Sequence, residues 1–266
     1  MRKFAVIIGQ TKFTGKDPRG CTTPVKTYPL PLILLLLAAC AGRADVPAKP
    51  PDPTHSPTPA HVPAPKTFLA LGDSFTIGES VPAGERWPVQ LTAALEAGGI
   101  PMAAPQLIAR TGWTTIELAN AIAASTLTPP YDLVTLLIGV NNQYRGYPQE
   151  TYREEFAALL QQAITFAGGD PAHVIVVSIP DWGAVPFAQS DARGPAQITA
   201  EVEAFNAISR AETARLGAHY VDIFPASQLA YDDPTLIAPD RLHPSGEQYR
   251  LWVAEILPVA AGLLAP

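Results

Sequence analysis

The stretch "FLALGDSFTIG", residues 68–78, decides the fold and raises the question of function. A short apolar run stops at Gly72-Asp73-Ser74. Asp and Ser are favoured residues at helix N-termini, so the stretch predicts a strand that turns directly into a helix. Ser74 is then either a residue that only starts a helix or a nucleophile displayed at the end of a strand. The rest of the chain has to decide between these interpretations.

Five short apolar runs predict strands, and helical patterns alternate with them. The runs are residues 67–71, 106–109, 133–138, 174–178 and 220–224. Almost wholly apolar strands that alternate with helices are typical of a parallel sheet covered on both faces. The sequence therefore predicts an α/β fold with a five-stranded parallel sheet. In such sheets ligands bind at the carboxyl ends of the strands.

Several helix boundaries are also readable. An apolar stripe at helical spacing covers residues 152–167, and a second stripe ends at Gly217. Pro88 and Gly98 bracket another helix, with proline near its start and glycine past its end. Ser245 and Gln248 have the spacing of a capping box at the start of the last helix.

The residues beyond the strands form a set suited to acyl transfer. Ser74 follows the first run, Gly112 the second and Asn141 the third, while Asp240 and His243 lie beyond a loop after the fifth. A serine hydroxyl attacks well only when a neutral imidazole removes its proton, and a carboxylate orients that imidazole. The N–H groups of Ser74 and Gly112 and the Asn141 amide are candidate donors to an oxyanion.

Each of these residues also has a structural explanation. Asp73 and Ser74 suit a helix N-cap, Gly112 suits a turn, and His243 before a proline suits a loop. A purely structural explanation must, however, account for four such residues in order, each beyond a predicted strand. The combination favours catalysis.

The blocks "FLALGDSFTIG", "ARTGWTT", "LLIGVNN" and "DRLHPSGEQY" resemble the SGNH (GDSL) hydrolases over essentially all of residues 67–266. The family's four signature residues correspond to Ser74, Gly112, Asn141 and His243. The resemblance implies a three-layer, flavodoxin-like α/β/α sandwich, and ester hydrolysis through an acyl-enzyme without metal or cofactor. It also implies that Asp240 completes a catalytic triad. One departure is Asn142, where the family usually has Asp.

The substrate is less readable than the reaction. Small-molecule, lipid and glycan esters all fit, including acetylated carbohydrates and lysophospholipids. Trp182 and Phe187 after the fourth run, with Tyr144 and Arg145 after the third, either wall a substrate pocket or cover the sheet edge. A competing hypothesis is a non-catalytic lipoprotein that binds cell-wall glycans on the same fold. Oligomeric state is not encoded in any visible pattern.

The N-terminal quarter of the chain reads as an export signal and a tether. Residues 30–39 form an apolar stretch too short to span a bilayer, and Cys40 follows in "LAAC", which resembles a bacterial lipoprotein signal. We expect residues 1–39 to be a signal segment, with translation starting at Val25 and residues 1–24 wrongly included. Residues 40–66 are then a lipidated cysteine and a proline-rich tether. This predicts an exported, membrane-anchored lipoprotein facing the periplasm or the cell exterior.

Charge argues against nucleic acid as a partner. Residues 1–39 hold six of the 18 Lys and Arg residues and one of the 24 Asp and Glu residues, so the remainder carries 12 basic and 23 acidic residues. A formal net charge of −11 repels phosphate backbones. His55 and His61 in the tether lack further ligands at metal-binding spacing, which favours a chain without a metal site.

Overall fold

The computed structural model describes residues 64–265. The expected signal segment 1–39, Cys40 and most of the tether 40–66 lie outside these residues. Within them the five-stranded parallel sheet has the order β2-β1-β3-β4-β5. This is the doubly wound order of flavodoxin-like folds, so the predicted fold class is confirmed.

The strands lie close to the predicted runs. They are β1 (Phe68–Gly72), β2 (Gln106–Ala109), β3 (Leu133–Leu137), β4 (Val174–Val177) and β5 (His219–Val221). All residues of β1, β3 and β4 are buried, as expected for strands covered on both faces. Gly72, the last residue of β1, pairs with Ala109 in β2 and with Leu137 in β3. The three strands therefore end at the same level.

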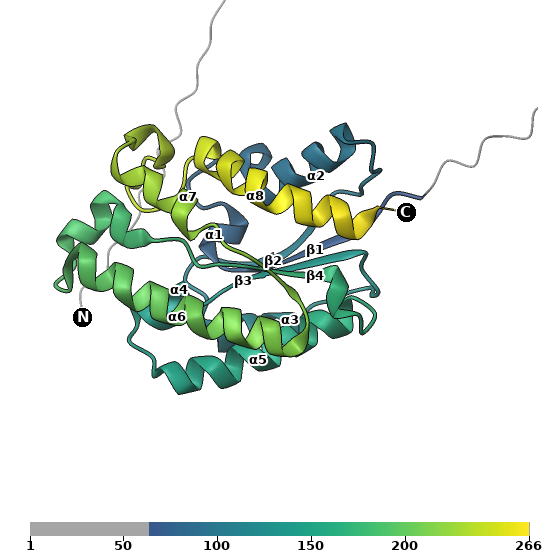
Figure 1. Cartoon of the computed structure of the whole chain (residues 1–266), viewed down its shortest axis with the longest axis horizontal. Helices are drawn as coiled ribbons and strands as arrows, with labels where there is room; N and C mark the ends of the chain where they lie inside the picture. Colours follow the sequence, from purple (N-terminus) through teal and green to yellow (C-terminus); the bar gives the residue numbers. More distant parts are fainter. Residues whose placement is uncertain (1–63, 266) are drawn as a thin grey trace, which may run out of the picture. The chain divides into compact units, whose positions relative to one another are not determined.

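Helices cover both faces of the sheet, which gives three layers (Figure 1). Helices α2 and α8 pack together on one face, and α3, α5 and α6 form the layer on the other. The α-helices are α1 (Ser74–Ile77), α2 (Trp87–Ala97), α3 (Thr115–Ala123), α4 (Val140–Tyr144), α5 (Gln149–Phe166), α6 (Gly194–Leu216), α7 (Phe224–Gln228) and α8 (Gly246–Leu264). Short 3-10 helices are η1 (Ala83–Glu85), η2 (Pro171–His173), η3 (Trp182–Ala184), η4 (Pro186–Ser190), η5 (Leu229–Tyr231) and η6 (Pro234–Leu236).

The expected helix ends are confirmed, with one correction at the start of α8 and a second at the end of β5. Gly98 and Gly217 follow α2 and α6 as C-caps. Ser245 caps α8 by accepting the Gln248 N–H at 3.3 Å, but the Gln248 side chain donates to the carbonyls of α7 instead of completing a capping box. The last strand was predicted too long, because residues 222–224 leave the sheet. Ser178 Oγ accepts the backbone N–H groups of Ile223 and Phe224 at 2.9 and 3.1 Å, which turns the chain into α7.

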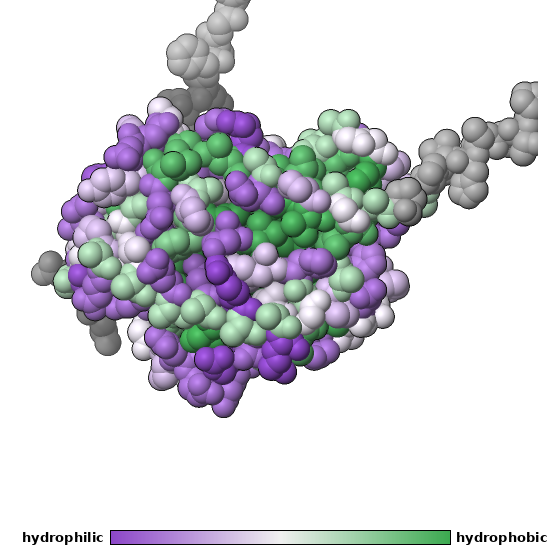
Figure 2. All heavy atoms as spheres, viewed as in Figure 1, coloured by the Kyte–Doolittle hydropathy of each residue, from purple (hydrophilic) through white to green (hydrophobic). Residues whose placement is uncertain are grey.

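One continuous hydrophobic core lies between the layers. Figure 2 shows hydrophobic residues at the level of the sheet, between the layer of α8 and that of α6. The largest fully buried side chains include Trp87, Trp252, Tyr152 and Tyr249. No helix within residues 64–265 has the length and apolar character needed to cross a membrane.

Candidate active site

At Gly72, the last residue of β1, there is no space for a side chain. A Cβ on Gly72 would lie 2.5 Å from the carbonyl oxygen of Leu137 in β3 and 2.2 Å from Thr76 Oγ1. Asp73 then caps α1 by accepting the Phe75 N–H at 3.0 Å. The helix is therefore capped by Asp73, and Ser74 is its first residue. Ser74 is 5% exposed, with its side chain at the carboxyl edge of the sheet.

Asp240 and His243 form a short pair in the loop before α8. His243 Nδ1 lies 2.6 Å from Asp240 Oδ2, and the backbone N–H of His243 donates to Asp240 Oδ1 at 2.9 Å. The carboxylate sets the tautomer: Nδ1 carries the proton, which leaves Nε2 able to accept one. Within residues 64–265 the His243 ring hydrogen-bonds to Asp240 alone. Ser74 and His243 are therefore not hydrogen-bonded to each other, although both line the cavity described below.

Asp240 accepts two further hydrogen bonds. Ser80 Oγ donates to its Oδ2 at 2.6 Å, and the Leu242 N–H donates to Oδ1 at 3.0 Å. Burial alone would raise the pKa of Asp240, but the bonds from Ser80, His243 and Leu242 lower it to about 2. Asp240 is therefore ionised at neutral pH. Ser80 adopts a left-handed backbone with φ 66°, uncommon for a residue other than glycine, and no sequence pattern pointed to it.

The second strand ends in a loop fixed from two sides. Gly112 has φ 87°, a conformation that favours glycine. Its carbonyl accepts Arg145 Nη2 at 2.6 Å, and Arg145 also pairs with Glu117 at 3.3 Å. Asn141 Nδ2 donates to the carbonyl of Trp113 at 3.0 Å. An amide nitrogen has two protons, so Asn141 retains one for a ligand.

Asn142, the residue that departs from the family pattern, is fully buried and structural in its contacts. Its Oδ1 accepts the Thr115 N–H at 3.1 Å, and its Nδ2 donates to Thr115 Oγ1 at 2.6 Å. The Thr115 hydroxyl then donates to Glu155. Glu155 thus provides the carboxylate in this network, and Asn142 supplies the amide proton that joins α4 to the start of α3.

One cavity of about 180 Å³ brings most of these residues together. It is lined by Ser74, Phe75, Thr111, Gly112, Val140, Asn141, Tyr144, Trp182, Phe187, Leu242 and His243. Asp240 lies behind His243, and Arg145 is absent from the lining because its guanidinium binds Gly112 and Glu117. Among the described residues, those of the lining include no Asp, Glu, Lys or Arg. Phe75, Val140 and Leu242 were missed because apolar residues beside a motif look like ordinary core.

The cavity walls are largely aromatic. Phe75 packs against the His243 ring with centroids 5.4 Å apart, while Trp182 contacts both Tyr144 and Phe187 at 5.6 and 6.1 Å. Residues 64–265 contain no group of three or more His, Cys, Asp or Glu side chains placed to hold a metal ion. The arrangement offers a hydroxyl, an oriented imidazole and several N–H donors around one apolar space.

The model of the GDSL-like lipase/acylhydrolase family matches residues 70–251. This match spans more than half of the chain and contains all the residues placed at the cavity. The chain belongs to this family. Family membership supports hydrolysis of esters as its general activity and small-molecule esters as its general substrates.

Solved structures share the fold at low sequence identity. A psychrotrophic esterase from Pseudoalteromonas sp., inhibited there by monoethylphosphonate, is 18% identical with a TM-score of 0.58, covering 76% of this chain and 100% of its own. A lipase/acylhydrolase from Enterococcus faecalis is 22% identical with a TM-score of 0.58, covering 74% and 96%. An acetylxylan esterase from Geobacillus stearothermophilus is 16% identical with a TM-score of 0.56, covering 73% and 94%. No curated protein matches the chain.

A first prediction concerns Asp73, whose environment is opposite to that of Asp240. Burial raises the pKa of Asp73 to about 7, and the Phe75 N–H lowers it only in part. An unfolded aspartate titrates at about 3.9, so the stability linked to this group is complete below that pH and is lost as pH rises through about 7. The free energy of unfolding, measured with urea, should fall as pH rises from 4 to 8. The fall should be smaller in Asp73→Asn.

The matched control for this prediction is Asp170→Asn. Asp170 caps η2 in the same way, accepting the Ala172 N–H at 2.9 Å, but it is exposed. Its stability curve should run parallel to that of the parent. Parallel curves for Asp73→Asn as well would contradict the assigned ionisation of Asp73.

Proposed function

We propose that the chain is a serine esterase that hydrolyses uncharged acyl esters through an acyl-enzyme. The observation that carries the proposal is the 2.6 Å pair of Asp240 and His243, placed so that the imidazole and the Ser74 hydroxyl face one cavity. A neutral imidazole with one nitrogen held by a carboxylate is the base that a serine nucleophile needs.

The reaction proceeds in two halves. Ser74 Oγ attacks the ester carbonyl while His243 Nε2 takes its proton, and the imidazolium formed is stabilised by the Asp240 carboxylate. The tetrahedral intermediate places its oxyanion near the N–H groups of Ser74 and Gly112 and the Asn141 amide. His243 then protonates the departing alcohol. Water, activated by the same imidazole, attacks the acyl-serine and releases the acid.

The cavity limits the substrate class. About 180 Å³ bounded mainly by Phe75, Val140, Trp182, Phe187 and Leu242 suits an uncharged acyl group of small to moderate size. No charged lining residue from the described part of the chain would pair with a carboxylate on the acyl group. Carbohydrate acetates and other short-chain esters meet these conditions better than single-chain lipid esters, whose acyl chains are longer than this volume suits.

The family match and the intact Ser74, His243 and Asp240 set favour the enzyme over a glycan-binding lipoprotein. A binding module has no need for a buried imidazole whose Nδ1 is held by a carboxylate. The similarity to an acetylxylan esterase is compatible with either a carbohydrate or a small-molecule ester.

Ser74→Ala is the direct test. Because Asp73 and not Ser74 caps α1, the substitution should change the unfolding free energy little while abolishing nearly all hydrolysis of p-nitrophenyl acetate. A fluorophosphonate should label the parent at Ser74, which mass spectrometry locates, and fail to label the variant. Ser125→Ala, outside the cavity, should keep the label. Labelling of a different serine, or full activity in folded Ser74→Ala, would refute the mechanism.

Asn141 and Asn142 provide a paired test of the oxyanion site. Asn141→Ala should lower kcat roughly 100- to 1,000-fold, the usual effect of losing one oxyanion donor. Asn142→Asp should affect kcat far less, but it removes the proton donated to Thr115 and should cost about 1–3 kcal/mol of stability. Steady-state kinetics and urea unfolding measure the two effects. A larger loss of kcat at Asn142 would reverse the assignment.

We further propose that the mature protein is lipidated at Cys40 and anchored to a membrane facing the periplasm or the cell exterior. The order of apolar stretch, "LAAC" and proline-rich tether supports this placement. Mass spectrometry of the native membrane fraction should find a mature N-terminus at a lipid-bearing Cys40. Recovery of an uncleaved chain that starts at Met1 or Val25 would refute it.

A further inference from the structure

Two rings of the cavity form a wall that other side chains hold from two sides. We define the aromatic wall as Tyr144, at the end of α4, and Trp182, at the start of η3. Their ring centroids are 5.6 Å apart in an edge-on contact, and both rings line the cavity that holds Ser74. Trp182 is 3% exposed, whereas Tyr144 is 48% exposed. The outer ring therefore needs support from other residues to keep a fixed position.

The edge of the Trp182 ring is tied through two hydrogen bonds. Trp182 Nε1 donates to Gln143 Oε1 at 2.8 Å, and Gln143 Nε2 donates to Glu201 Oε2 at 2.7 Å. Gln143 is 2% exposed, so both ends of a buried amide are satisfied by this chain. The indole N–H thus has one defined partner, which fixes the rotation of the ring.

The face of the wall is covered by Arg193, the residue before α6. Its guanidinium carbon lies 5.2 Å from the centroid of Trp182 and 5.5 Å from that of Tyr144. Asp191 holds the guanidinium in place through Nε and Nη2, both at 2.9 Å. This side-chain pairing lowers the pKa of Asp191 to about 2. A guanidinium over aromatic faces attracts them through the ring quadrupole.

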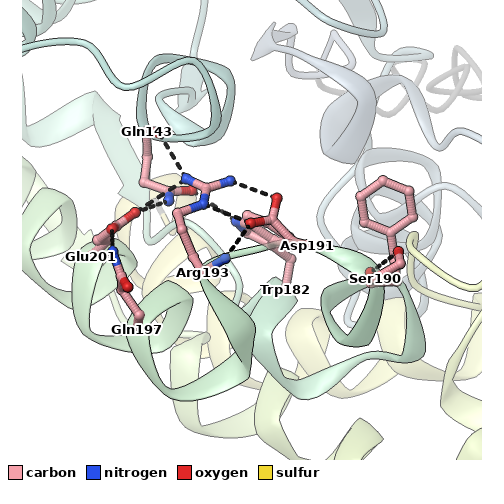
Figure 3. Close-up of polar contacts among 8 residues, drawn as sticks. Gln143, Trp182, Ser190, Asp191, Arg193, Gln197 and Glu201 are labelled. Atoms are coloured by element: carbon pink, nitrogen blue, oxygen red, sulfur yellow. Dashed lines mark hydrogen bonds and ion pairs between the residues drawn. The ribbon is translucent and has the colours of Figure 1, made fainter.

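The two supports meet at Glu201, and Figure 3 shows the polar contacts between them. Arg193 Nη1 lies 3.2 Å from Glu201 Oε2, the same oxygen that accepts Gln143 Nε2. A path therefore runs from the edge of Trp182 through Gln143, Glu201 and Arg193 back to the face of Trp182. Loss of the guanidinium would leave Trp182 bonded to Gln143 and would release chiefly the exposed Tyr144 ring.

Arg193 is poorly suited to bind a substrate anion. Asp191 and Glu201 already surround its guanidinium with two negative charges, and the fork is committed to Asp191. Arg193 also lies outside the cavity lining, while the rings it covers lie inside. Its influence on substrate must therefore pass through the aromatic wall.

The backbone beneath the wall has a separate anchor. Asp181 accepts the Gly183 N–H at 2.8 Å and bonds to Thr199 Oγ1 at 2.9 and 3.0 Å, and Gln228 Nε2 donates to it at 3.0 Å. Removing Arg193 leaves all these bonds in place. The expected response is movement of the exposed Tyr144 ring, while Trp182 stays bonded to Gln143 and its loop stays folded.

We propose that Arg193 is a specificity-determining positioning residue that holds the aromatic wall closed and so limits the acyl chain length that the cavity accepts. The inference rests on the proposed esterase function and adds the element that selects among esters. With the wall fixed, short uncharged acyl groups fill the cavity, and longer chains meet Tyr144 and Trp182.

The test compares Arg193→Met with Arg210→Met as a matched control. Arg210 lies in α6, stacks on Tyr220 at 4.9 Å and pairs with Asp222, so it makes the same kinds of contact away from the cavity. We would measure kcat and KM of purified protein on p-nitrophenyl acetate, butanoate and octanoate. For Arg193→Met the ratio of kcat/KM for octanoate to that for acetate should rise about five-fold or more, mainly through KM. Arg210→Met should keep the parent ratio.

Asp191→Asn is a second variant in case Arg193→Met does not fold, as judged by circular dichroism. It frees the guanidinium from its principal anchor but keeps the arginine stem, so a smaller shift in the same direction is expected. If the parent is active but the octanoate-to-acetate ratio of kcat/KM is unchanged or lower in folded Arg193→Met, this inference is overturned and the proposed function stands. Where only Asp191→Asn folds, the same result in that variant has the same meaning. The same rise in Arg210→Met as in Arg193→Met would also overturn the inference. A parent inactive on all three esters and unlabelled at Ser74 would overturn the proposed function and this inference with it.

Discussion

The close parallel pairing of β1 with β3 is the constraint on which the site depends. Gly72 ends β1 opposite Leu137, and the missing side chain lets the backbone of β3 approach it. The chain leaves β1 into α1 with Ser74 and leaves β3 into α4 with Asn141. Because the two strands end level, a hydroxyl and an amide separated by 67 positions in the sequence numbering line one cavity. The loop that brings His243 needs only to reach this edge.

Residues that follow a strand directly were predictable from sequence, and residues that act across long separations were not. A buried parallel strand must deliver the next residue to the sheet edge, which is why Ser74, Gly112 and Asn141 could be placed in advance. Ser80 reaches Asp240 across 160 positions from a left-handed turn, and no local pattern encodes that contact. The predicted end of β5 failed for a related reason, because Ser178 in a neighbouring segment captures the backbone N–H groups that would have continued the strand.

The residues around the cavity also include some whose position the sequence indicates and some whose position it does not. The sequence does not decide whether Trp182, Phe187 and Tyr144 form a pocket wall or cover the sheet edge. In the structure all three line the cavity. Arg145 lies outside it and fixes the Gly112 loop through a carbonyl, a contact that depends on how α4 packs beside that loop. A lone arginine in a sequence carries no information about which carbonyl its fork will meet. The role of Arg193 was unpredictable for the same reason, since its partners other than the nearby Asp191 come from α4, η3 and α6.

Two carboxylates near Ser74 show how packing assigns different chemistry to the same side chain. Asp73 is buried with one backbone donor, and burial raises its pKa to about 7. Asp240 gathers bonds from Ser80, Leu242 and His243, which lower its pKa to about 2 despite partial burial. Environments that push two carboxyl groups apart separate their roles. In the proposed mechanism, Asp240 keeps the full negative charge that stabilises an imidazolium at His243, whereas a full charge at Asp73, next to Ser74, would oppose the negative charge that develops on the substrate. The burial of Asp73 and the hydrogen bonds to Asp240 therefore act together, because they favour a stable negative charge at Asp240, behind His243, over one at Asp73.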